Sequence, residues 1–238
     1  MTARPKQTPF FRSTFTLLAF CLSALLTPTV FAAEGEYTVT KLSEPAAGLS
    51  EAVTSVLSTD GVRVTGKEGV ICDIWFAKEI GLKPGFQPNL RIQYPFLAGQ
   101  LIGAIRFPDS SKPHDFRGQE FKAGVYTLRY GLQPDDGNHL GTSDIRDFLM
   151  ACPAEGDKDP KRIEKIKDVF KLSAKAAGTA HPTIFLLLPP AEKAFDAPAV
   201  KHDEEKKYVI LSINVPTKDK GAEKIIPVNV VTVGQFEG

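Results

Sequence analysis

Short apolar segments, separated by turns rich in Pro and Gly, constrain the fold of this chain most strongly. The clearest are residues 70–80, 101–107, 125–132, 182–188, 207–215 and 225–233. Their lengths suit β-strands, and in 125–132 apolar and polar side chains alternate between the two sides. The chain does not alternate strands and helices as a parallel sheet would require. The pattern predicts a mostly β, antiparallel sandwich or barrel, and we expect a β-sandwich in a single domain over residues 35–238.

Three shorter features refine this expectation. The β-branched stretch 53–57, the Asp60-Gly61 turn and the alternating residues 62–64 predict a hairpin. The alternative at this place is a helical turn that begins within 49–52. A further short strand is expected at 119–122. Pro227, inside an otherwise apolar strand, indicates a sheet edge or a bulge.

One segment has helical spacing. Ile163, Ile166 and Phe170 fall on one stripe, and mainly basic residues cover the rest of 161–175. Asp159 and Pro160 suit a helix start, and Gly178 suits its end. We expect one amphipathic surface helix on the side of the sandwich. Its basic face suits an anionic envelope polymer as a partner, and equally suits plain solvation.

The N-terminus has the layout of a secretory signal peptide. Residues 1–12 carry three basic residues and no acid, and 13–33 carry no charge. The apolar run 15–26 and Pro28 precede small residues, so we expect cleavage after Ala32 and a signal peptide over 1–32. An uncleaved anchor is the alternative. The expectation is a protein of the periplasm or a secreted one, with no stable membrane span after cleavage.

The formal net charge changes sign once this leader is removed. The 238 residues carry a formal charge of +1, of which Arg4, Lys6 and Arg12 supply three positive charges. Without residues 1–32 the formal charge is therefore −2. Nucleic-acid binders usually carry a basic excess, so a nucleic-acid partner is not expected. The charge is also segregated, with acid in 135–147 and base in 161–175.

An acidic segment after the 125–132 strand is the most unusual polar feature. Oxygen-rich clusters bind calcium, and an added histidine makes zinc conceivable. The spacing does not match an EF-hand, and Pro134 to Gly137 also reads as a turn, followed by a helix cap at Thr142 or Ser143. The candidate metal ligands are Asp135, Asp136, Asn138, His139, Asp144 and Asp147.

Two further residue sets carry hypotheses. Cys72 and Cys152 remain after leader removal, and export permits a disulfide between them, although buried free thiols fit equally well. The rings of Trp75, Tyr94 and Phe96 suit a sugar-binding or apolar-ligand surface, with core packing as the commoner alternative.

No familiar catalytic motif is present, so the catalytic residues, if there are any, are unknown from the sequence. A nucleophile elbow, a zinc-protease motif, a phosphate loop and a haem attachment site are all missing. This favours a non-enzymatic binding or structural module of the periplasm or envelope, binding an envelope polymer or a small ligand. The alternative is a metal-binding protein or metal-dependent hydrolase that uses 135–147, with calcium or zinc as its cofactor.

The run GVYTLRYGLQPDDGNHLGTSDIRDFLMACP, residues 124–153, resembles a segment of uncharacterised secreted bacterial proteins. The stretches HPTIFLLLPP and VNVVTVGQFEG fit the same resemblance, which covers about a third of the chain. It implies a β-sandwich of unknown activity and supplies no catalytic residues to transfer.

Overall fold

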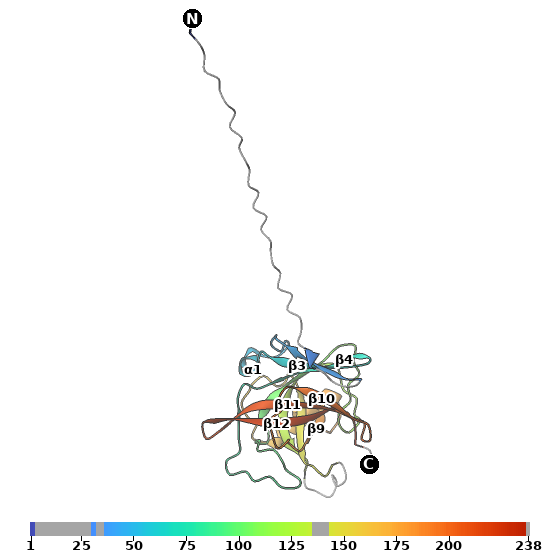
Figure 1. The fold of residues 1–238 in the computed structure, drawn as a ribbon. Helices are drawn as coiled ribbons and strands as arrows, with labels where there is room; N and C mark the ends of the chain where they lie inside the picture. The colour runs from blue at the N-terminus through green and yellow to red at the C-terminus, as the bar shows by residue number, and fades with distance from the viewer. Residues whose placement is uncertain (3–29, 32–35, 135–142, 237–238) are drawn as a thin grey trace.

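The strands of this computed structural model form one sheet, and the structure describes residues 1–2, 30–31, 36–134 and 143–236 (Figure 1). The expected signal peptide lies almost entirely outside these residues. The strands are β1 Val30–Phe31, β2 Thr38–Leu42, β3 Gly61–Gly66, β4 Gly69–Phe76, β5 Ile80–Gly81, β6 Leu101–Phe107, β7 Gly124–Leu132, β8 Asp147–Pro153, β9 Ile184–Leu188, β10 Ala199–Asp203, β11 Tyr208–Asp219 and β12 Ala222–Val233. The helices are α1 Glu51–Val56 and α2 Ile166–Ala177.

The sheet is antiparallel along its main path and nearly closes into a barrel. The order is β1-β2-β3-β4-β6-β7-β8-β9-β12-β11-β10, with β5 added parallel to β11. The two ends of this path come together, since the rings of Tyr37 and His202 lie 5.0 Å apart beside β2 and β10. The mostly β, antiparallel prediction is confirmed.

The expected sandwich is not confirmed. A sandwich has two separate sheets, whereas here β8 pairs with β9 and β9 pairs with β12, so hydrogen bonding continues from one layer to the other. Figure 1 shows the result, with β3 and β4 lying over β11 and β12. The long, twisted strands β11 and β12 curve the sheet around its own core.

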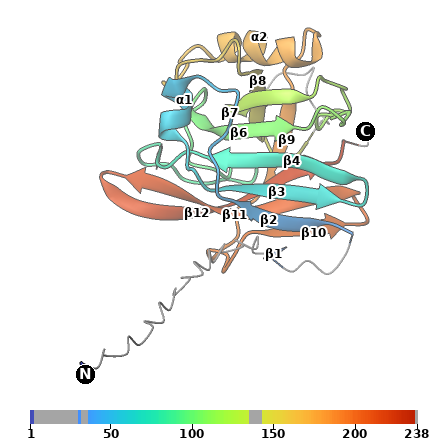
Figure 2. The ribbon, with the colours of Figure 1, turned by 90° about the horizontal axis from the view of Figure 1, so that it is seen from above.

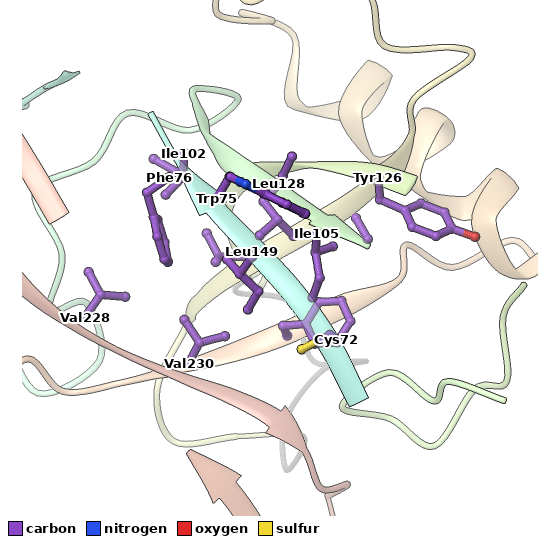
Figure 3. Packing of buried hydrophobic residues seen from close by; sticks show 14 of the residues in the cluster. Cys72, Trp75, Phe76, Ile102, Ile105, Tyr126, Leu128, Leu149, Val228 and Val230 are labelled. Atoms are coloured by element: carbon purple, nitrogen blue, oxygen red, sulfur yellow. The ribbon is translucent and has the colours of Figure 1, made fainter. Parts of the chain in front are cut away.

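The main core fills the inside of this barrel. Phe76 of β4, Leu149 of β8 and the β12 residues Val228 and Val230 come from three different strands and converge there (Figure 3). All four are at most 5% exposed. Full burial of such a side chain contributes about 1.5–3 kcal/mol, so these alternating inward positions hold the barrel together.

A second core lies on the outer face of the sheet, beneath α2. Phe148, Met150 and Cys152 of β8 pack there with Val169 of the helix. Figure 2 shows α2 as the outermost element on this side. The strand β8 is apolar on both faces, and α2 buries the outer one. This explains why β8, which follows the polar segment where we expected a helix cap, is a strand that the periodicity did not predict.

The helix prediction is confirmed with a later start. The helix begins at Ile166, and the expected cap, Asp159, instead accepts a hydrogen bond from the backbone N–H of Lys161 (2.9 Å). The helix ends at Gly178, whose φ of 66° is the left-handed conformation that glycine favours. Among the described residues no helix combines the length and the apolar character needed to cross a bilayer.

Two local predictions are wrong. Residues 53–57 were expected as a strand, but α1 occupies this place, which confirms the alternative of a helical turn that begins within 49–52. The Ser50 side chain accepts a hydrogen bond from Val53 N–H (3.2 Å) and caps this helix. Residues 119–122 form no strand, and only a single bridge joins His114 and Glu120 there. The edge position of Pro227 is confirmed, because β9 pairs with β12 only at Asn229 and Val230 in the described sheet.

Candidate functional site: the open mouth of the barrel

The connections between neighbouring strands divide between two ends of the barrel. The β3–β4, β6–β7 and β10–β11 connections lie at one end, which we call the mouth end. The β4–β6, β7–β8 and β11–β12 connections lie at the other, which we call the closed end. This division follows from the antiparallel order, in which successive turns alternate between the ends.

A cavity of about 1110 Å³ opens at the mouth end. Its apolar lining includes Tyr37, Val70, Ile71 and Phe107. The Phe107 ring also reaches into the core, where it contacts the rings of Phe121 (5.1 Å) and Phe185 (5.9 Å) between centroids. The mouth of a barrel is a common place for a small-ligand site, and the partly exposed side chains of Tyr37, Val70 and Ile71 give this cavity an apolar floor.

The rim of the cavity is basic. Four lysines and one histidine line it against two glutamates, and these residues are Glu36, Lys67, Glu68, Lys112, His114, Lys206 and Lys207. Lys67 is paired with Glu36 at 3.0 Å, whereas Lys112 and Lys206 form no ion pair with any described residue. Its four lysines outnumber its two glutamates, so the lining carries an excess of two positive charges. An anionic group in the cavity would therefore be attracted, with a strength that salt reduces because the rim is exposed.

The β10–β11 turn presents two of these lysines by local geometry. The Asp203 side chain accepts a hydrogen bond from Lys206 N–H at 3.1 Å, which closes the turn. Lys207 then adopts a φ of 54°, a left-handed conformation that few residues other than glycine take up. The turn is thereby held so that both residues line the cavity.

The wall formed by the β6–β7 connection is held by a buried carboxylate. Asp115 is 0% exposed and accepts hydrogen bonds from the backbone N–H groups of Arg117 (2.9 Å), Gln119 (2.9 Å) and Ile184 (3.2 Å). The last of these fastens the connection to β9. The C-terminal segment adds a further tie, since Phe236 N–H donates to the Phe116 carbonyl at 2.8 Å. The wall is therefore fixed to the barrel before any ligand binds.

The closed end holds one of the predicted metal ligands in another role. Asp147 is 0% exposed and accepts hydrogen bonds from Gln93 N–H (2.7 Å), Tyr94 N–H (3.3 Å) and the Tyr130 hydroxyl. Burial raises the pKa of the Asp147 carboxyl above its ordinary value. The carboxylate thus fastens the 89–96 segment across the end of the barrel, which is a structural task.

The predicted metal site is not assembled by the part of the chain that can be described. Asp144 is exposed and Asp147 is committed to the contacts above, and the four other candidates, Asp135, Asp136, Asn138 and His139, lie outside the described residues. Within residues 36–134 and 143–236 no group of three or more His, Cys, Asp or Glu side chains is placed to hold a metal ion.

The three aromatic candidates lie in the core. Trp75, Tyr94 and Phe96 are 1%, 0% and 3% exposed, and none of them lines the mouth cavity. The Trp75 indole N–H donates to the Glu44 carbonyl at 2.8 Å, and the Tyr94 and Phe96 rings stack at 5.5 Å. Their apolar patterning therefore reflects packing in the core.

The predicted disulfide does not form. Cys72 and Cys152 are both buried free thiols, Cys72 in the barrel interior and Cys152 beneath α2 on the outer face. Two strands, β6 and β7, separate β4 from β8. Neighbouring strands are about 4.8 Å apart, so the two cysteines are well beyond the distance of about 7 Å that a disulfide spans. Burial raises the pKa of both thiols, which makes them poor nucleophiles.

A buried ion pair that the sequence analysis missed supports the outer face of β7. Arg129 is 0% exposed, and its Nε and Nη2 atoms donate to the two Asp157 oxygens at 2.6 and 2.7 Å. Its remaining N–H groups donate to the carbonyls of Gly99, Asp159 and Lys161. The only signal in the sequence is an arginine in the middle of an otherwise apolar and hydroxylic strand.

The polar groups of the mouth are suited to binding. The Ser111 hydroxyl donates to the Pro108 carbonyl at 2.7 Å, and His114 faces Glu120 with 3.9 Å between Nε2 and Oε2. Neither contact joins a nucleophile to a general base, which is the arrangement that covalent catalysis requires. The cavity offers apolar area, hydroxyls and positive charge, the set of groups that holds an amphipathic anion.

Comparison of the chain with family models, curated proteins and solved structures finds no match. The fold and the mouth cavity therefore carry the functional argument without support from relatives.

Proposed function

We propose that this chain is an exported, non-enzymatic binding protein of the bacterial periplasm or envelope, and that the mouth cavity binds a small amphipathic anion. The single observation that supports this class of ligand is the cavity of about 1110 Å³, which combines an apolar floor with a lysine-rich rim. The compartment rests on the basic, apolar and small-residue layout of residues 1–32.

The two parts of the cavity would bind the two parts of such a ligand. Tyr37, Val70 and Ile71 offer apolar surface to a hydrocarbon or ring, at roughly 25 cal/mol for each Å² removed from water. Lys112 and Lys206 offer charge to a carboxylate or phosphate at the rim. Exposed pairs of this kind contribute about 0.2–1 kcal/mol each, so charge sets selectivity and apolar burial sets most of the affinity.

The test is isothermal titration of the protein with octanoate and, as a neutral match, octanol. We expect binding of both, with octanoate preferred at low salt. The K112A/K206A variant should lose about three- to tenfold of that preference and retain octanol binding. The S110W variant, which adds an indole to the lining, should weaken both ligands.

The matched control is K83A/K193A, which removes two exposed lysines outside the cavity. It should bind both ligands as the wild type does. The proposal fails if neither ligand binds the wild type, or if K112A/K206A keeps the full preference for octanoate.

A further inference from the structure

A basic face on α2 lies apart from the mouth. Three lysines, Lys167, Lys171 and Lys175, follow one another at intervals of four residues and are all exposed. They share one side of the helix, opposite the side on which Val169, Ser173 and Ala176 are buried. At 1.5 Å per residue the three span about 12 Å along the helix. We call this stripe the basic face of α2.

The surroundings of this face concentrate positive charge. Residues 158–175 contain seven lysines and arginines against three acids, an excess of four charges in a chain whose formal total is +1. None of the three lysines of the basic face forms an ion pair with a described residue, and Asp168 is the only acid within α2. The charge is therefore available to a partner outside the molecule.

The apolar side of α2 is packed against the sheet and is not exposed to that partner. The Ser173 hydroxyl donates to the Ala151 carbonyl at 2.8 Å and accepts from Thr183 N–H at 3.0 Å, which fixes the helix to β8 and to the start of β9. Val169 is 0% exposed in the core beneath the helix. A partner is thus met by charge alone, without insertion of the helix.

We infer that the basic face of α2 docks the protein onto an anionic phospholipid bilayer. Figure 2 shows α2 projecting as the outermost element on its side of the barrel, and a projecting helix meets a flat surface along its whole length. A polymer strand would be held by a groove, whereas α2 is convex. Flexible, strongly hydrated lysines suit the diffuse charge of lipid headgroups, each contributing about a fivefold gain in affinity near such a surface.

The experiment is co-sedimentation of the mature protein with vesicles of phosphatidylglycerol mixed with phosphatidylcholine, or of phosphatidylcholine alone. We expect binding to the anionic vesicles at low salt and release at about 1 M salt, where the Debye length falls to about 3 Å. The K167E/K171E/K175E variant should bind about 100-fold more weakly or worse, because three attractive charges become repulsive. The charge-conserving K167R/K171R/K175R variant should bind as the wild type does.

A matched variant separates this surface from net charge. K83E/K193E/K201E changes the total charge equally at exposed lysines outside α2 and should bind within about threefold of the wild type. Thermal melting of every variant confirms that it folds. The inference fails if the control weakens binding as much as the α2 variant does, if phosphatidylcholine vesicles bind equally, or if the protein binds dextran sulfate while leaving anionic vesicles in solution.

Discussion

The two ends of the barrel differ in how their polar side chains are placed: buried and hydrogen-bonded at the closed end, exposed at the rim of the mouth. At the closed end, Tyr94, Tyr130 and Asp147 are buried, and their polar atoms donate to or accept from one another and the backbone. At the mouth end, Lys112 and Lys206 are exposed and without ion pairs to described residues. Buried polar groups contribute to stability only through their partners, whereas exposed charges cost the fold little. The buried network around Asp147 therefore supports the fold, whereas the two exposed rim lysines contribute little to it.

The largest change in the free energy of unfolding is expected on breaking the buried ion pair between Arg129 and Asp157. R129M removes all five guanidinium N–H donors and leaves the Asp157 carboxylate buried without a counter-charge. Breaking a buried pair from one side typically costs about 3–5 kcal/mol of unfolding free energy. Urea unfolding followed by circular dichroism measures it.

The same pair offers its own control. R129M/D157L removes both charges, and we expect it to recover a large part of the loss, because an apolar pair of similar volume needs no counter-charge. The surrounding carbonyls of Gly99, Asp159 and Lys161 would still lack their donor, so recovery is incomplete. A loss of less than about 1 kcal/mol in R129M would show that the pair does not anchor residues 157–161.

A smaller loss of unfolding free energy is expected on replacing Asp147, the carboxylate that fastens the closed end. D147N places an amide nitrogen where a carboxylate oxygen accepts from Tyr94 N–H and the Tyr130 hydroxyl, or from Gln93 N–H. A buried donor left without its acceptor costs about 1–3 kcal/mol. Unfolding in urea with calcium and then with a chelator also tests the predicted metal role. A loss that appears only with calcium present would restore Asp147 as a ligand.

The difference in stability between the wild type and D147N should change with pH in a defined direction. Burial raises the pKa of Asp147, so the folded protein binds a proton more tightly than the unfolded chain does. The wild type therefore gains stability as pH falls through the folded-state pKa, and the gain is complete below the unfolded value of about 3.9. D147N cannot titrate at this position. The stability advantage of the wild type over D147N should thus widen from pH 7 toward pH 4, and an advantage that narrows would contradict the assignment.

The sequence predicted elements whose local pattern and tertiary surroundings agree. The alternation in 125–132 predicted β7, and Gly178 marked the end of α2. Prediction failed at a local helix cap that the β-branched residues obscured, and at places where distant contacts override local preference. Ser50 caps α1 at the β-branched stretch 53–57. The strand β8 is apolar on both faces, and its outer face is buried by α2, which follows it in the sequence. The start of α2 lies after residues 159–161, where the carbonyls of Asp159 and Lys161 accept hydrogen bonds from Arg129.

The candidate site was hidden for a related reason. Tyr37, Lys67, Lys112 and Lys206 each belong to a different connection or terminus, and no local motif unites them. Only closure of the barrel brings these four segments to one mouth. The aromatic candidates show the converse, since Trp75 and Tyr94 look like ligand-binding residues in the sequence but are needed inside the core.

The smallest change in the free energy of unfolding is expected at the rim of the mouth. K112A/K206A removes two exposed side chains with no ion pairs to described residues, so the free energy of unfolding should stay within about 0.5 kcal/mol of the wild type. The same variant is expected to lose selectivity for octanoate, which separates binding from stability at this end. At the closed end D147N should do the reverse, lowering stability while octanoate is still preferred over octanol by the folded protein. A rim variant that loses more than about 1 kcal/mol would show that the mouth lysines support the fold, and the contrast between the two ends would then be wrong.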